Sequence, residues 1–83
     1  MANVERNTAI PLYLQIAEDI KSKIKKEELK ANSRIPTELE LSYFYQVSRI
    51  TIRKALELLV DEEILIRKKK KEHLYQIKKY PEQ

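Results

Sequence analysis

The hydrophobic positions of this chain predict three helices followed by two short strands. The third helix is expected at residues 49–62, where four apolar residues recur at the i, i+3, i+4 and i+7 spacing of one helical face: Ile52, Ala55, Leu56 and Leu59. Ser48 precedes this segment, and its hydroxyl can accept a hydrogen bond from an unpaired amide of the first turn. This part of the chain is therefore expected to form a capped helix with one buried face.

Two earlier segments have the same helical periodicity. The first helix is expected at residues 11–26, where Pro11 suits the first turn and an apolar stripe follows: Tyr13, Ile16, Ala17, Ile20 and Ile24. The second is expected at residues 38–45, because Thr37 and Glu40 match a capping box in which each side chain binds the other residue's backbone N–H. Its expected inward-facing residues are Leu41, Phe44 and Tyr45. The second helix ends so close to the cap of the third that the two helices are typical of a helix-turn-helix.

Two short apolar segments near the end of the chain predict a β-hairpin. Residues 64–66 and 74–77 are rich in β-branched, aromatic and other apolar residues, which favour strands. The basic run between them should occupy the hairpin tip: Arg67, Lys68, Lys69, Lys70, Lys71 and Glu72. The predicted fold is mainly α with a small β-hairpin, a winged helix-turn-helix over residues 10–77. A flexible arm at 1–9 precedes it, and a tail or the start of a linker follows at 78–83.

Composition argues against several classes of function. The 83 residues, of which 42% are hydrophobic, suffice for one small domain with its own core. There is no cysteine, and the lone His73 cannot form a metal site by itself, so neither a metal nor a cofactor is expected. No nucleophile–base pair and no glycine-rich phosphate loop stands out, which argues against an enzyme. No apolar run approaches the ~20 residues of a membrane span, and the first residues are unlike a signal peptide, so we expect a soluble cytoplasmic protein.

Basic charge is concentrated at one end of the chain. Residues 1–63 carry 10 basic and 11 acidic side chains, whereas residues 64–83 carry seven basic and two acidic ones. Such a cluster on a small domain indicates a polyanionic partner. A membrane surface could also attract these lysines, but no amphipathic helix flanks them. Nucleic acid is the favoured partner.

The exposed face of the third helix carries side chains that can read DNA. At about 100° per residue, the side opposite the apolar stripe holds Ile50, Arg53, Lys54 and Glu57, with Arg49 and Thr51 on its flanks. An arginine can pair bidentately with guanine, a threonine can bond base or phosphate, and an isoleucine can contact a thymine methyl group. Taken alone, the pattern also fits a solvated charged helix face.

Four motifs extend this pattern along residues 10–77. They are Pro11-Leu12-Tyr13 with Gln15-Ile16-Ala17, Arg34-Ile35-Pro36-Thr37-Glu38, Leu41, and Val47-Ser48-Arg49 with Thr51-Ile52-Arg53 and Ala55-Leu56. Together they resemble the DNA-binding domain of the GntR family of bacterial transcription regulators. The resemblance implies a sequence-specific domain, usually a repressor's, that acts as a homodimer on a palindromic operator of double-stranded DNA. It further implies control by a small-molecule effector that binds a C-terminal domain.

The resemblance also implies how the domain meets DNA: the third helix enters the major groove, and the wing enters the minor groove or contacts phosphates. The residues then expected to contact DNA are Thr37, Ser48, Arg49, Ile50, Thr51, Arg53, Lys54, Lys68, Lys69, Lys70 and Lys71. The chain departs from the family where Leu39 replaces an arginine and where glycines are replaced by Gln46, Glu63, Lys70 and Glu72. These departures motivate an alternative, a winged-helix domain with weakened DNA binding that is used for protein–protein contact.

Overall fold

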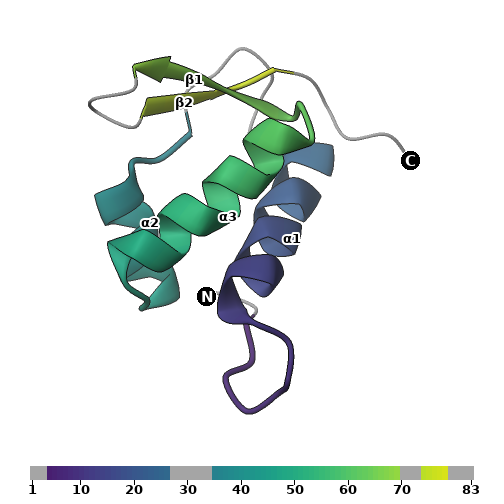
Figure 1. The fold of residues 1–83 in the computed structure, drawn as a ribbon, viewed down its shortest axis with the longest axis vertical. Coiled ribbons are helices and arrows are strands. Elements are labelled where there is room, and N and C mark those ends of the chain that lie inside the picture. Colours follow the sequence, from purple (N-terminus) through teal and green to yellow (C-terminus); the bar gives the residue numbers. More distant parts are fainter. Residues whose placement is uncertain (1–3, 27–34, 70–73, 79–83) are drawn as a thin grey trace.

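In the described part of the chain, three α-helices and a two-stranded antiparallel sheet follow one another, as the hydrophobic pattern predicted (Figure 1). The computed structural model describes residues 4–26, 35–69 and 74–78. The elements are α1 (Leu12–Lys25), α2 (Glu38–Tyr45), α3 (Arg49–Asp61), β1 (Leu65–Lys69) and β2 (Leu74–Ile77). All three helices have the predicted bounds to within one residue at each end. Within the described ranges, no helix has both the length and the apolar content needed to cross a membrane.

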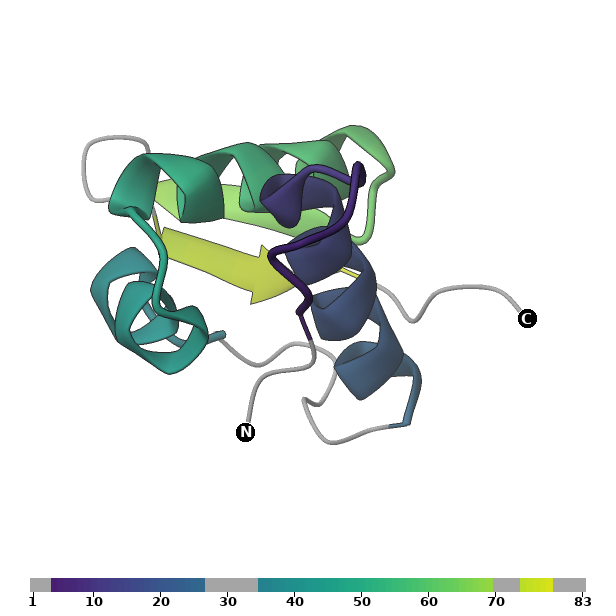
Figure 2. The same cartoon turned by 90° about the horizontal axis from the view of Figure 1, so that it is seen from below.

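The core lies where α1, α3 and the hairpin meet. Figure 1 shows α3 between the other two helices, and Figure 2 shows the hairpin running alongside α3. The predicted apolar stripe of α3 is fully buried: Ile52, Ala55, Leu56 and Leu59. These residues form one cluster with the α1 stripe and the hairpin, namely with Ile16, Ala17, Ile20, Ile24, Leu65, Tyr75 and Ile77. The apolar periodicity therefore identified the buried faces of α1 and α3 correctly.

The second helix is fixed by its cap and by one buried aromatic ring. The Thr37 hydroxyl accepts a hydrogen bond from the Glu40 N–H at 3.1 Å, and Glu40 Oε1 accepts one from the Thr37 N–H at 2.9 Å, so the predicted capping box is present. Leu41 and Tyr45 are buried as predicted. The Tyr45 hydroxyl donates to Asp19 Oδ2 of α1 at 2.6 Å, which ties the two helices together. Burial, and then the contact with this carboxylate, raises the pKa of Tyr45.

The position of Phe44 contradicts the prediction for the second helix. Phe44 was expected to face inward, yet 43% of it is exposed. Successive helical residues point about 100° apart, so Tyr45 takes the inward direction and Phe44 turns outward. There the Phe44 ring meets Tyr45 edge-on with centroids 4.9 Å apart, and Lys23 Nζ lies 5.8 Å from its centroid.

The hairpin begins later and runs further than predicted. Ile64 precedes β1, whereas the first part of the basic run, Arg67 to Lys69, lies inside the strand rather than at the hairpin tip. The reason is that β2 offers hydrogen-bond partners to the backbone of these residues, and such pairing does not depend on their side chains. The apolar pattern therefore ended at residue 66, whereas the backbone pairing with β2 continues to Lys69.

The two strands pair antiparallel through one irregularity. Leu65 lies opposite Ile77 and Arg67 opposite Tyr75, and the register then shifts before Lys69. A shift of this kind leaves one residue of the longer strand without a partner and increases the local twist. Three residues of the predicted hairpin tip, Lys70, Lys71 and Glu72, lie outside the described residues.

The described part of the N-terminal arm contacts the helices. The side-chain amide of Gln15 binds the backbone of Glu5 twice: the Glu5 N–H donates to Oε1 at 2.6 Å, and Nε2 donates to the Glu5 carbonyl at 2.8 Å. Arg6 Nη2 donates to the carbonyls of Tyr45 and Gln46 at 2.8 and 2.9 Å. The arm thus connects α1 to the end of α2, while its flexibility stays a prediction.

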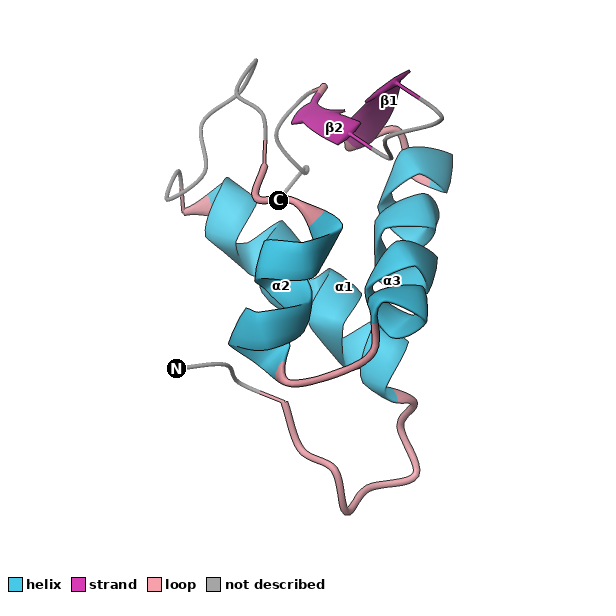
Figure 3. Cartoon of the chain, turned by 90° about the vertical axis from the view of Figure 1, so that its left-hand side faces the viewer, coloured by secondary structure: helices cyan, strands magenta, loops and turns pink. Residues whose placement is uncertain are grey.

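Two turns use a left-handed backbone without glycine. Gln46 has φ 57° and ψ 50° in the short turn between α2 and α3 (Figure 3), and Glu63 has φ 62° after α3. These are two of the positions at which the resemblance implied glycine. A left-handed conformation costs a residue that has a Cβ atom about 1–2 kcal/mol. The fold therefore carries a local conformational cost at both turns.

We expect Gln46→Gly to be more stable than Gln46→Ala by about 1 kcal/mol. Both variants remove the side chain, but alanine keeps the Cβ atom that disfavours a positive φ, and part of glycine's advantage is lost to its greater freedom in the unfolded chain. Urea denaturation of the two variants beside the wild type measures the difference. Equal stabilities would mean that the alanine variant changes its turn conformation at no cost.

Candidate nucleic-acid interface

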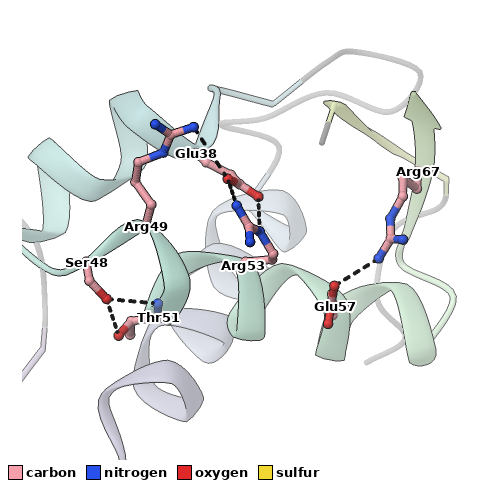
Figure 4. Close-up of polar contacts among 7 residues, drawn as sticks. All are labelled: Glu38, Ser48, Arg49, Thr51, Arg53, Glu57 and Arg67. Carbon is pink, nitrogen blue, oxygen red and sulfur yellow. Dashed lines mark hydrogen bonds and ion pairs between the residues drawn. The ribbon is translucent and has the colours of Figure 1, made fainter. Parts of the chain in front are cut away.

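The exposed face of α3 begins at its N-cap. Ser48 Oγ accepts a hydrogen bond from the Thr51 N–H at 3.1 Å and lies 3.0 Å from the Thr51 hydroxyl oxygen (Figure 4). The predicted cap is thus confirmed, and it fixes the direction in which the first turn points. Both hydroxyls are held at the N-terminus of the helix, where the dipole favours an anionic group.

Two side chains of the first turn project from α3 into solvent. The Arg49 side chain is 59% exposed, and Ile50 is 67% exposed. One turn further on, Lys54 is also exposed, and its Nζ lies 4.9 Å from the centroid of the Tyr13 ring in α1, within cation–π range. The predicted combination of cationic and apolar groups therefore lies on one side of the helix, opposite the buried stripe.

Arg53 is held by a carboxylate rather than left free on this face. Its Nε donates to Glu38 Oε2 at 3.0 Å, and its Nη2 donates to Glu38 Oε1 at 3.1 Å (Figure 4). Arg49 Nη2 lies 4.0 Å from the same Oε1 atom, so one carboxylate faces both arginines of α3. The hydrogen bond from Arg53 to Glu38 is the largest cause of the raised pKa of Arg53.

Glu38 was absent from the predicted site. The capping box assigned roles to Thr37 and Glu40, and no nearby residue assigned a role to Glu38. A signal was nevertheless present, because Glu38 precedes Leu41 and Tyr45 by three and seven residues and so shares their inward-facing stripe. An acid on a buried stripe needs a partner, and the cations lie on another helix, so sequence spacing could not identify them.

The hairpin is connected to α3 through a second arginine–carboxylate pair. Arg67 Nη2 donates to Glu57 Oε2 at 3.1 Å (Figure 4). The Arg67 guanidinium also lies 5.8 Å from the centroid of the Tyr75 ring. Burial raises the pKa of Tyr75. Two of the predicted DNA contacts, Lys68 and Lys69, belong to the strand that Arg67 anchors. The base of the wing is thus fixed relative to the exposed face of α3.

Thr37 belongs to the same junction. It is exposed at the start of α2, one residue before the carboxylate that pairs with Arg53. Of the predicted DNA contacts on the helices, five lie on or at the start of the first part of α3: Ser48, Arg49, Ile50, Thr51 and Arg53. Thr37 lies next to Glu38, which pairs with Arg53. Lys54 lies toward α1.

This arrangement is that of a known family. The family described as "Bacterial regulatory proteins, gntR family" matches residues 12–72. The chain belongs to this family. Its sequence is 40% identical over 67 residues to the "HTH-type transcriptional repressor NagR" of Bacillus subtilis (strain 168), a stretch that covers 81% of this chain and 28% of that repressor. The chain thus spans little more than a quarter of the length of this curated relative.

Solved structures of the family share its fold. "YtrA from Sulfolobus acidocaldarius, a GntR-family transcription factor" has 32% identity and a TM-score of 0.83 over 94% of this chain and 80% of that one. The AraR DNA-binding domain, solved in complex with its operator ORX1, has 32% identity and a TM-score of 0.75 over 88% of this chain and 90% of that one. The chain therefore has the winged-helix fold of the DNA-binding domains in this family, whose relatives reported above are transcription regulators.

Proposed function

We propose that this domain represses transcription by placing α3 in the major groove of an operator and the hairpin on the minor groove or the phosphates. The observation that carries the proposal is that Arg49, Ile50 and Arg53 lie on the side of a capped helix opposite its buried stripe. The major groove admits an α-helix, and its base edges display acceptors for arginine and methyl groups for apolar side chains.

The side chains of the interface divide into two roles. Arg49 and Arg53 suit base edges, because a planar guanidinium can pair with guanine through two hydrogen bonds, and Ile50 suits a thymine methyl group. Hydroxyls and lysine ammonium groups suit phosphate oxygens, which position a protein on the duplex without reading its sequence. We assign this second role to Thr37, Ser48, Thr51, Lys54 and the four lysines at 68–71.

Membership of the family supports a set of proposed partners. AraR, whose DNA-binding domain resembles this one, was solved bound to an operator, which supports double-stranded DNA as the partner here. We propose that the regulator acts in the cytoplasm as a homodimer on a palindromic site, with a small-molecule effector only where a C-terminal domain accompanies this one. The isolated domain presents one recognition helix and should bind a half-site weakly.

Selection of bound duplexes from a random DNA pool tests the proposal. We expect one short motif to be enriched, and electrophoretic shift assays should show tighter binding to this selected duplex than to random DNA of equal length. Two inverted copies of the motif should be preferred when the domain is fused to a dimeric partner. The proposal is contradicted if no motif is enriched and micromolar protein shifts no duplex at low salt.

A second candidate function is protein–protein contact through the same fold. Leu39 is 45% exposed and Tyr43 is 74% exposed on α2, one turn apart and so on one side of that helix. Exposed apolar side chains of this kind suit a surface that binds another protein. Leu39 also stands where the family usually has arginine. The shift assay also decides between these functions, because the second predicts no sequence-specific binding of DNA.

A further inference from the structure

A buried carboxylate lies under the DNA-facing side of the domain. The Glu38 side chain is 3% exposed, yet it lies at the first position of α2 and reaches across to α3. A buried carboxylate is costly unless cations and hydrogen bonds compensate it. Two arginines of α3 serve this purpose, Arg53 at 3.0 and 3.1 Å and Arg49 at 4.0 Å. Their geometry is therefore coupled to the position of Glu38.

The atoms used in this contact leave the outer edge of the Arg53 guanidinium available. Glu38 accepts from Nε and from one N–H of Nη2, which together form the inner edge of the planar group. Arginine has five N–H donors, so the two N–H groups of Nη1 and the second N–H of Nη2 are not used in these two bonds. The edge formed by Nη1 and Nη2 is one that can pair bidentately with guanine O6 and N7.

We propose that Glu38 is a positioning residue for DNA recognition, which orients Arg53, and to a lesser degree Arg49, so that the free guanidinium edge meets the bases. This inference rests on the proposed function. Two hydrogen bonds to a fixed, buried carboxylate hold the plane of the Arg53 guanidinium before DNA arrives. Binding then costs less side-chain entropy than it would for an unrestrained arginine. The carboxylate also offsets part of the local positive charge, which weakens binding to phosphates of any sequence.

Replacing Glu38 with glutamine should change the two kinds of binding in opposite directions. Affinity for the selected duplex should fall by about 3–10-fold, the cost of ordering one long side chain anew. Affinity for random DNA should rise by about threefold, which is the effect in water of removing one negative charge at an assumed separation of about 7 Å from a phosphate. Fluorescence anisotropy on both DNAs measures the two changes. A general loss of folding would lower both affinities instead, and thermal melting of the variant detects it.

Glu38→Asp separates positioning from charge. Aspartate keeps the negative charge, but its carboxylate is withdrawn by one methylene and cannot reach both nitrogens of Arg53 in the same geometry. We expect the selected duplex to be bound about 3–10-fold more weakly and random DNA to be bound as by the wild type. Glu18→Gln is the matched control for charge, since Glu18 is 69% exposed on α1 and pairs with Lys21; its ratio of selected to random affinity should equal that of the wild type.

A double-mutant cycle with Arg53→Gln decides whether Glu38 acts through Arg53. In the wild-type background, Glu38→Gln should lower the ratio of selected to random affinity by about 10–30-fold, because the loss on the selected duplex and the gain on random DNA multiply. In the Arg53→Gln background, the same substitution should lower this ratio by less than twofold. Additive losses would overturn the inference and assign Glu38 a DNA contact of its own. An unchanged ratio in both Glu38 variants would also overturn it, while a wild type that fails to discriminate would instead overturn the proposed function.

Discussion

Replacing Leu56 with alanine should lower the free energy of unfolding by about 2–5 kcal/mol. Leu56 is fully buried at the middle of the α3 stripe, in one cluster with α1 and the hairpin. Truncation removes three carbon atoms from this core, and the surrounding helices can close the resulting cavity only in part. Chemical denaturation followed by circular dichroism measures the loss. For a domain of this size the expected change is a large part of the total stability.

Ile50→Ala is the matched control for this prediction. Ile50 lies on the same helix and has the same number of side-chain carbons, but it is 67% exposed. Its replacement should change stability by about 0.5 kcal/mol or less. Similar losses for both variants would mean that α3 is rotated relative to this structure, and the assignment of its DNA-facing side would fail with it.

The features that the sequence predicted best are those with local causes. Thr37 and Ser48 cap helices through hydrogen bonds to backbone groups three residues away, so a short pattern contains all the information needed. The buried stripes of α1 and α3 follow from helical periodicity in the same way. Two left-handed turns, at Gln46 and Glu63, lie where glycine was expected by resemblance.

The features that the sequence missed depend on contacts between distant segments. Adjacent aromatic residues compete for one inward direction, and the hydrogen bond to Asp19 on another helix favours Tyr45 over Phe44. Glu38 and Arg53 stand 15 residues apart and meet only because α2 and α3 pack together. Helical periodicity placed Arg53 on the correct face but could not show that this face includes a buried acid.

The two basic parts of the interface should differ in what they contribute to binding. Arg49 lies on a capped helix and is 59% exposed, so it can be placed against a particular base edge. The other basic part is the run of four lysines at 68–71. An ammonium group is a compact point charge, which suits phosphates better than bases. Replacing Arg49 with alanine should therefore lower the preference for the selected duplex over random DNA, by about 1–3 kcal/mol if the contact is bidentate.

Replacing all four lysines at 68–71 with glutamine should weaken binding to every DNA sequence by nearly the same factor. Counterion release gives the logarithm of affinity a slope of about −0.9 on the logarithm of salt concentration for each neutralised phosphate. The variant should flatten that slope by at most about 3–4 units and leave the ratio of selected to random affinity nearly unchanged. Salt titrations of both variants on both DNAs measure slope and ratio together. If the lysine variant loses discrimination while Arg49→Ala keeps it, the hairpin reads the sequence and α3 supplies the phosphate contacts.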